Sequence, residues 1–198
     1  MAGTRKRIEA LIDKLEKHGA RVAGVELGDP MEASLPDLIA ELGGVQPPPP
    51  LLDLYREIDG AALMWNLEHE GQALAGGFNL QEIRVAMLRN GAEADSEPLE
   101  GILWTGDEEP DRVELLRKMV IFDSVPGRND FLTFLIDDPA QLYLIADGEP
   151  AKLHSSLDET LDVLIEHGGA DSLRVHLTHT DWRGRVAADP ELEAIRKL

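Results

Sequence analysis

Three short apolar runs follow one another closely in this chain: Met119-Val-Ile-Phe122, Phe131-Leu-Thr-Phe-Leu-Ile136 and Leu142-Tyr-Leu-Ile-Ala146. Two segments with strong turn chemistry separate them, Val125-Pro-Gly-Arg-Asn-Asp130 and Asp137-Asp-Pro-Ala140. Runs of this length that contain β-branched and aromatic residues and are joined by short turns predict strands. The spacing predicts an antiparallel meander.

The chain before this meander is mainly helical in pattern. Apolar residues at helical spacing predict an amphipathic helix over residues 5–18, which Gly19 ends. Further helices are predicted within residues 31–42, starting around Ser34, and over 51–58 and 81–89. Between them, strands are predicted over residues 61–67 and 75–80, and a short strand or an extended linker over residues 22–27.

A last core helix is predicted after the meander. Ser155 or Ser156 caps it, and Glu159 lies where a capping box requires it. Beyond it, Leu173-Arg-Val-His-Leu177 is interpreted as a strand and residues 191–198 as a terminal helix. This order of elements predicts an α+β fold, in which helices pack against a mostly antiparallel, twisted β-sheet.

The composition restricts the chemistry. There are 38 Asp and Glu against 19 Lys and Arg, which gives a formal charge of −19. Such a surface repels nucleic acids and anionic membranes and attracts basic proteins. The chain has no cysteine, which excludes disulfides, thiolate zinc sites and cysteine nucleophiles. Neither a secretory leader nor a membrane-spanning run is present, so we expect a cytoplasmic protein.

The segment from residue 93 to residue 111 is the most acidic, with eight Asp and Glu and no Lys or Arg. Its middle contains the apolar run Ile102-Leu-Trp104. Because tryptophan is enriched among interface hot spots, we predict a partner-binding surface here. Its residues are Trp104, Glu100, Asp107, Glu108, Glu109 and Asp111. Replacing Trp104 by Ala is expected to weaken partner binding by about 2 kcal/mol or more. Trp65 is instead interpreted as a core residue.

The strongest catalytic candidate is His176-Leu-Thr-His179-Thr-Asp181. Two imidazoles and a carboxylate are acceptable ligands for zinc or iron. On a strand, however, side chains three residues apart point to opposite faces, so we expect a surface strand and turn here. The sequence contains neither a glycine-rich phosphate loop nor a Gly-x-Ser-x-Gly elbow. No catalytic residue, metal ligand or cofactor is therefore assigned.

Three segments carry a family resemblance. The first is Pro50-Leu-Leu-Asp-Leu-Tyr-Arg-Glu-Ile-Asp-Gly60 and the strand that follows, which contains Trp65. The second is the turn Phe122-Asp-Ser-Val-Pro-Gly-Arg-Asn-Asp130 with its flanking strands. The third is the strand from Leu142 with the helix that begins after Ser156. Together they resemble the SUKH superfamily, which contains a fungal cell-wall-assembly regulator and many bacterial toxin-immunity proteins.

The resemblance implies an α+β fold, no cofactor and a function in binding proteins, since bacterial members typically neutralise a toxin, often a nuclease. It implies an N-terminal helix and extension (1–30), a SUKH-like domain (31–168) and a C-terminal extension (169–198) packed on or beside it. We therefore expect a non-enzymatic, immunity-type protein that binds a basic toxin domain. A regulatory or adaptor domain without a toxin partner is one alternative, and a metal-dependent hydrolase using His176, His179 and Asp181 is another.

Overall fold

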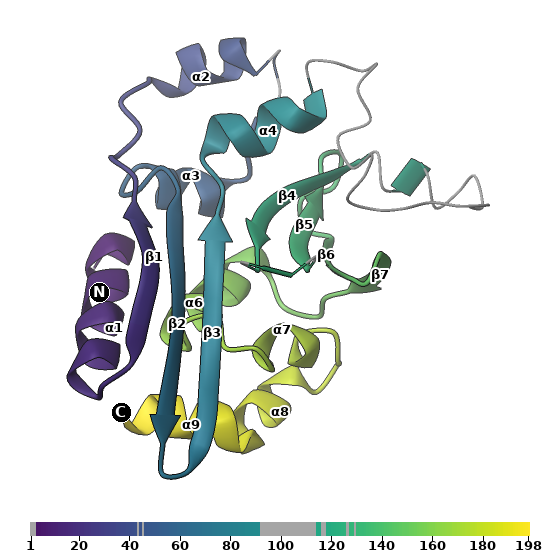
Figure 1. Cartoon of the computed structure of the whole chain (residues 1–198). Coiled ribbons are helices and arrows are strands. Elements are labelled where there is room, and N and C mark those ends of the chain that lie inside the picture. The colour runs from purple at the N-terminus through teal and green to yellow at the C-terminus, as the bar shows by residue number, and fades with distance from the viewer. Residues whose placement is uncertain are drawn as a thin grey trace.

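The described strands form one antiparallel sheet in the computed structural model of the chain (Figure 1). The structure describes residues 3–42, 44, 46–91, 114–115, 118–125, 127–128 and 130–198. Neighbouring strands in the sheet also follow one another in the chain, so the sheet is a simple meander. The strands are β1 (Arg21–Leu27), β2 (Ala61–His69), β3 (Gln72–Leu80), β4 (Met119–Ser124), β5 (Phe131–Leu135), β6 (Leu142–Ala146) and β7 (Glu149–Lys152).

Helices precede, interrupt and follow the meander, which confirms the predicted α+β fold with a mostly antiparallel sheet. Within the described residues they are α1 (Thr4–Lys17), α2 (Leu35–Glu41), α3 (Pro49–Tyr55), α4 (Ile83–Gly91), α6 (Leu157–Glu166), α7 (Leu173–His176), α8 (Trp182–Ala188) and α9 (Pro190–Lys197).

Local sequence signals set several helix ends. The hydroxyl of Ser34 accepts the N–H of Asp37 and caps α2, as its position predicts. A complete capping box opens α6: Ser156 accepts the N–H of Glu159, whose carboxylate in turn accepts the N–H of Ser156. Gly19 follows α1 with a φ of +85°, a conformation that glycine adopts without strain.

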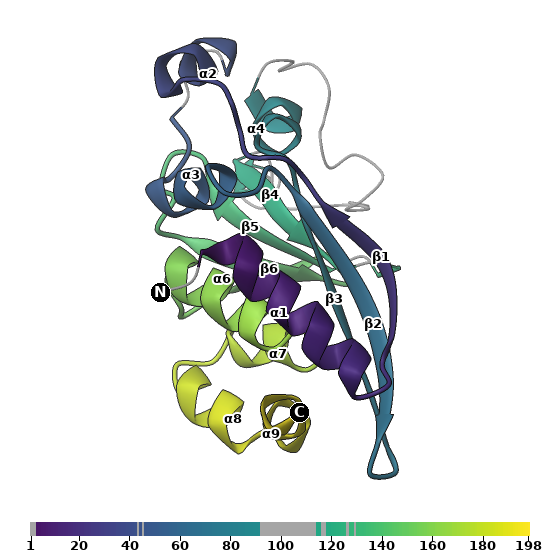
Figure 2. The ribbon, with the colours of Figure 1, turned by 90° about the vertical axis from the view of Figure 1, so that its left-hand side faces the viewer.

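The helices α1 and α6 lie against one face of the sheet, which we call the inner face (Figure 2). A large cluster of buried side chains fills the space between the two layers. It includes Ile8 of α1, Trp65 of β2 and Ile195 of α9, so segments before residue 31 and after residue 168 share one core with the middle of the chain.

The sheet changes partner in the middle of β3. Pairing with β4 covers only the top of β3, where Asn79 lies opposite Ser124 and Leu80 opposite Asp123. Lower down, β3 bonds instead to the segment after α6: the N–H of Gly77 donates to the Gly169 carbonyl at 3.0 Å. A β-carbon on Gly169 would lie 2.2 Å from the Gly77 carbonyl oxygen, so this close approach requires glycine.

The sheet therefore consists of two halves that differ on the outer face, opposite the helices. We call β1–β3 the open half and β4–β7 the closed half. In β5, Leu132 and Phe134 belong to the main core, whereas Phe131 and Leu135 belong to a second buried cluster. Because side chains alternate along a strand, this second cluster lies on the outer face. Its buried members are Met119, Phe131, Leu135 and Ile145.

The C-terminal region corrects one prediction. The strand expected over Leu173–Leu177 is wrong, since α7 occupies Leu173–His176. Leu173 and Leu177 are both fully buried, whereas Val175 between them is 53% exposed. That pattern fits a helix, because residues four apart share a face, and it does not fit a strand, in which all three would point the same way. The strand β7 and the helix α8 were not predicted.

Candidate functional site

The helices α1 and α6 lie against the inner face of the sheet and leave the outer face of the open half uncovered (Figure 2). Along β2, buried positions alternate with exposed or partly exposed ones, and the register places each outward residue opposite an outward residue of β3. The outward residues are Ala62, Met64, Asn66 and Glu68 on β2 and Ala73, Ala75, Gly77 and Asn79 on β3. Four of these eight residues are alanine or glycine, and Met64 projects from the face with 43% of its surface exposed.

The end of this face nearest α4 contains a hollow of about 400 Å³, which we call the acidic hollow. Three carboxylates, those of Glu26, Asp59 and Glu82, belong to residues that line it, and no lining residue is a lysine or an arginine. One carboxylate oxygen of Asp59 accepts the N–H of Ile83 at 2.9 Å and so holds the start of α4 beside the hollow. The residues that line the hollow therefore carry three negative charges and no positive one. Two arginines lie close by: Arg5 donates to the carbonyl of the lining residue Gly28 at 3.2 Å, and the charges of Asp59 and Glu82 act on Arg84.

A second, smaller hollow of about 220 Å³ lies on the same face, and we call it the glycine hollow. It adjoins Met64 and Asn66 of β2 and the pair Gly76-Gly77 of β3. Gly77 lies opposite Met64 in the register and has no side chain to fill the space. Arg128 and Asp171, also among the lining residues, form an ion pair with 2.5 Å between Nη2 and Oδ2.

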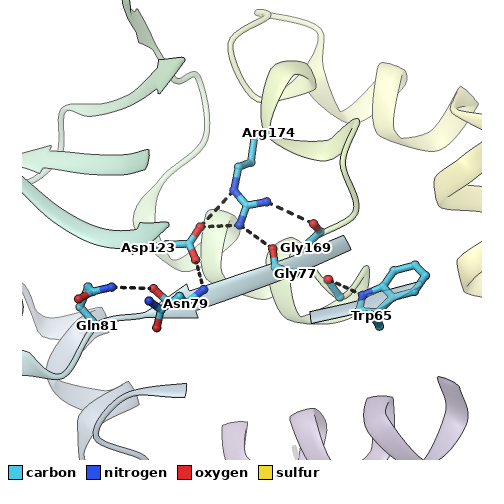
Figure 3. Close-up of polar contacts among 8 residues, drawn as sticks. Trp65, Gly77, Asn79, Gln81, Asp123, Gly169 and Arg174 are labelled. Atoms are coloured by element: carbon cyan, nitrogen blue, oxygen red, sulfur yellow. Dashed lines mark hydrogen bonds and ion pairs between the residues drawn. The ribbon is translucent and has the colours of Figure 1, made fainter. Parts of the chain in front are cut away.

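A buried ion pair lies where β3 leaves β4 (Figure 3). The guanidinium of Arg174 donates to Asp123 Oδ2 at 2.6 and 3.1 Å and to the carbonyls of Gly77 and Gly169. The other carboxylate oxygen of Asp123 accepts the N–H of Asn79 at 3.0 Å. Burial raises the pKa of Asp123, while the charge and hydrogen bonds of Arg174 act in the opposite direction. This network holds β3, β4 and α7 together beneath the outer face.

Trp65 of β2 bonds the inner side of the sheet to the turn after α6. Its indole Nε1 donates to the Gly168 carbonyl at 2.8 Å, and the side chain is 1% exposed, so its interpretation as a core residue is confirmed. Gly168 has a φ of +59°, and a β-carbon there would lie 2.8 Å from Nε1. The turn after α6 thus bonds to β2 through Trp65 and to β3 through Gly169.

The residues of the predicted acidic surface, Trp104, Glu100, Asp107, Glu108, Glu109 and Asp111, lie outside the described residues. Two of the three candidate metal ligands, His176 and Asp181, have partners outside the proposed site. His176 Nε2 lies 2.6 Å from Asp189 Oδ2, and Asp181 pairs with Arg185 at 2.9 Å. Across the described ranges, no group of three or more His, Asp or Glu residues is placed to hold a metal ion.

Sequence reasoning missed the outer face of the open half, although a signal for it was present. In residues 61–69, Leu63, Trp65 and Leu67 alternate with Met64, Asn66 and Glu68, a pattern typical of a strand with one covered face. The Asp123–Arg174 pair had no such signal, because its members are 51 residues apart in the chain.

Comparisons of the chain with protein-family models, with curated proteins and with solved structures found no match. Among the described helices, none combines the length and the apolar character needed to cross a membrane.

Proposed function

We propose that the chain is a non-catalytic protein-binding domain of the immunity type, which binds and neutralises a basic toxin domain in the bacterial cytoplasm. The observation that carries the proposal is the distribution of charge. Residues 22–83 contain eleven Asp and Glu and a single basic residue, Arg56, so they supply a net −10 of the formal −19. These residues include β1 apart from its first residue, Arg21, together with β2, β3 and the two helices between them.

Part of the acidic surplus lies at one end of the uncovered sheet face. Glu26, Asp59 and Glu82 all belong to residues 22–83 and line the acidic hollow. An enzyme that holds phosphate groups has a basic active site, so an acidic protein is attracted to it and covers it. Such attraction raises association rates to roughly 10⁸–10⁹ M⁻¹s⁻¹ at low salt. The SUKH resemblance supports the same proposal, since bacterial members of that group typically neutralise toxins.

Co-expression tests this proposal. The chain is produced together with a basic toxin domain encoded by a neighbouring gene, and growth of the host is compared with and without the chain. We expect the chain to restore growth and to form a complex whose affinity falls as salt is raised. A chain that neither restores growth nor binds the toxin domain would contradict the proposal. Binding without protection would favour the regulatory or adaptor alternative.

A further inference from the structure

We propose that the outer face of the open half is the docking surface for a basic protein partner. The partner places an apolar side chain over Met64 and a lysine or arginine against the acidic hollow. This inference rests on the proposed function and assigns it to one surface. Four observations on the described residues lead to it.

The first observation is the apolar exposure of this half. The large hydrophobic residues that the described structure exposes are Val25 (44%), Met64 (43%) and Val175 (53%). Two of the three belong to β1 and β2 of the open half, and Met64 points outward beside the glycine hollow. In the closed half, the corresponding outer residues, such as Ile145, are fully buried. A single exposed apolar side chain is ordinary on a protein surface, so Met64 supports the inference only together with the hollows and the charge beside it.

The second observation is that both edges of the sheet resist pairing with another strand. In β1 the register with β2 shifts between Ala23 and Glu26, and Gly24 has a φ of +64°. The other edge strand, β7, contains Pro150, which has no N–H to donate. Bulges and prolines are devices that block edge-to-edge association. A partner is therefore expected to use the face of the sheet.

The third observation is charge, which selects between a second copy of this chain and a different protein. A second copy docked face to face would add a second set of Glu26, Asp59 and Glu82 to the interface, and the lining of its acidic hollow would supply no lysine or arginine to pair with them. Like charges brought close together across an interface oppose association. A partner with lysine or arginine at the same place instead gains a favourable interaction. The face therefore fits a basic partner and not a homodimer.

The fourth observation is spacing. Ala62 lines the acidic hollow and Met64 lines the glycine hollow, and the two residues are two positions apart on β2. Residues two apart on a strand point the same way and lie about 7 Å apart. A partner segment with a basic and an apolar residue on one face at this spacing reaches both hollows at once.

The test uses the full chain and a fluorescently labelled peptide that repeats arginine-serine-leucine-serine, with a glutamate-serine-leucine-serine peptide for comparison. An extended peptide of the first kind presents arginine and leucine on one face. Fluorescence anisotropy gives the affinities at low and high salt. We expect binding of the arginine peptide alone, and we expect Met64→Arg to weaken it at least about tenfold, because the new charge replaces the apolar contact with leucine and lies beside the arginine side chains of the peptide.

Val175→Arg is the matched control, since it makes the same charge change at an exposed apolar residue of α7. We expect it to change the affinity less than about twofold, as for a charge outside the contact surface. A second comparison uses two double variants that each remove two negative charges. One is Glu26→Gln with Glu82→Gln at the acidic hollow, and the other is Asp13→Asn with Glu16→Gln on α1. Only the first pair is expected to reduce both the affinity and its salt dependence.

Equal effects of Met64→Arg and Val175→Arg would overturn the inference. So would a dimer in solution that Met64→Arg dissociates. The co-expression assay separates the two proposals: toxin protection that survives Met64→Arg would retain the function and reject the surface. Peptide binding confined to this face without any toxin protection would retain the surface and reject the function.

Discussion

The outer faces of the two halves of the sheet differ in how far their side chains are buried. In the closed half, all five residues of β5 are buried, because a second apolar cluster covers the outer side. In the open half, β2 alternates buried and exposed residues along its length. An outer face that takes no part in the core is not needed for folding. The inner face of the open half still contributes Leu63, Trp65 and Leu67 to the main core, so only its outer face is available to a partner.

The two halves share the main core, but the strand pairing between them is short. Only two residue pairs join β3 to β4, and the Arg174–Asp123 pair lies beside them. Because both charges are almost completely buried, the attraction between them offsets the cost of removing each from water. Substitutions at this junction are therefore expected to have the largest effect on stability.

The largest effect is expected for Arg174→Met, which leaves the Asp123 carboxylate buried without its partner. We expect the free energy of unfolding, measured by urea denaturation, to fall by about 3–5 kcal/mol. The double variant Asp123→Asn with Arg174→Met removes both charges, and Asn still accepts the N–H of Asn79. It should therefore be more stable than Arg174→Met alone. A double variant that is less stable would show that the pair is not the reason for the loss.

A matched pair of truncations compares the two outer faces directly. Ile145→Ala in the closed half removes a fully buried side chain and is expected to lower the free energy of unfolding by about 2–5 kcal/mol. Met64→Ala in the open half is expected to change it by less than about 0.5 kcal/mol, because the side chain is largely exposed. The measurement is again urea denaturation. Similar losses for the two variants would remove the distinction between the halves.

The smallest effect on stability is expected from the protonation of His167. Burial lowers the pKa of His167, at the end of α6, and the nearby charges of Glu166 and Arg196 act in opposite directions. Below about pH 6.5 the unfolded chain binds a proton at this histidine that the folded protein does not. Stability should therefore rise with pH through this range and fall as pH drops.

The measurement is the urea midpoint at several pH values for the protein and for His167→Leu. The difference between the two isolates the histidine from the carboxylates, which titrate at lower pH. We expect the variant to lose less stability on acidification. An unchanged pH dependence would show that His167 takes up its proton equally in both states.

Much of the architecture follows from local pattern. Apolar periodicity and turn chemistry predicted the strands β1–β6 and the helices α1, α2, α3, α4, α6 and α9, because these signals depend on residues only a few positions apart. The prediction was wrong at Leu173–Leu177, where alternating apolar residues are typical of a strand. There the burial of Leu173, Arg174 and Leu177 selects a helix, through contacts with segments far away in the chain.

The sequence alone was sufficient to predict the class of fold, the excess of negative charge and the capped helix ends. Each of these depends on composition or on residues that are neighbours in the chain. Which sheet face stays uncovered, where Glu26, Asp59 and Glu82 gather, and how Asp123 meets Arg174 depend on the folded chain. Each of these features joins residues separated by tens of positions, and only packing of the helices and strands brings them together.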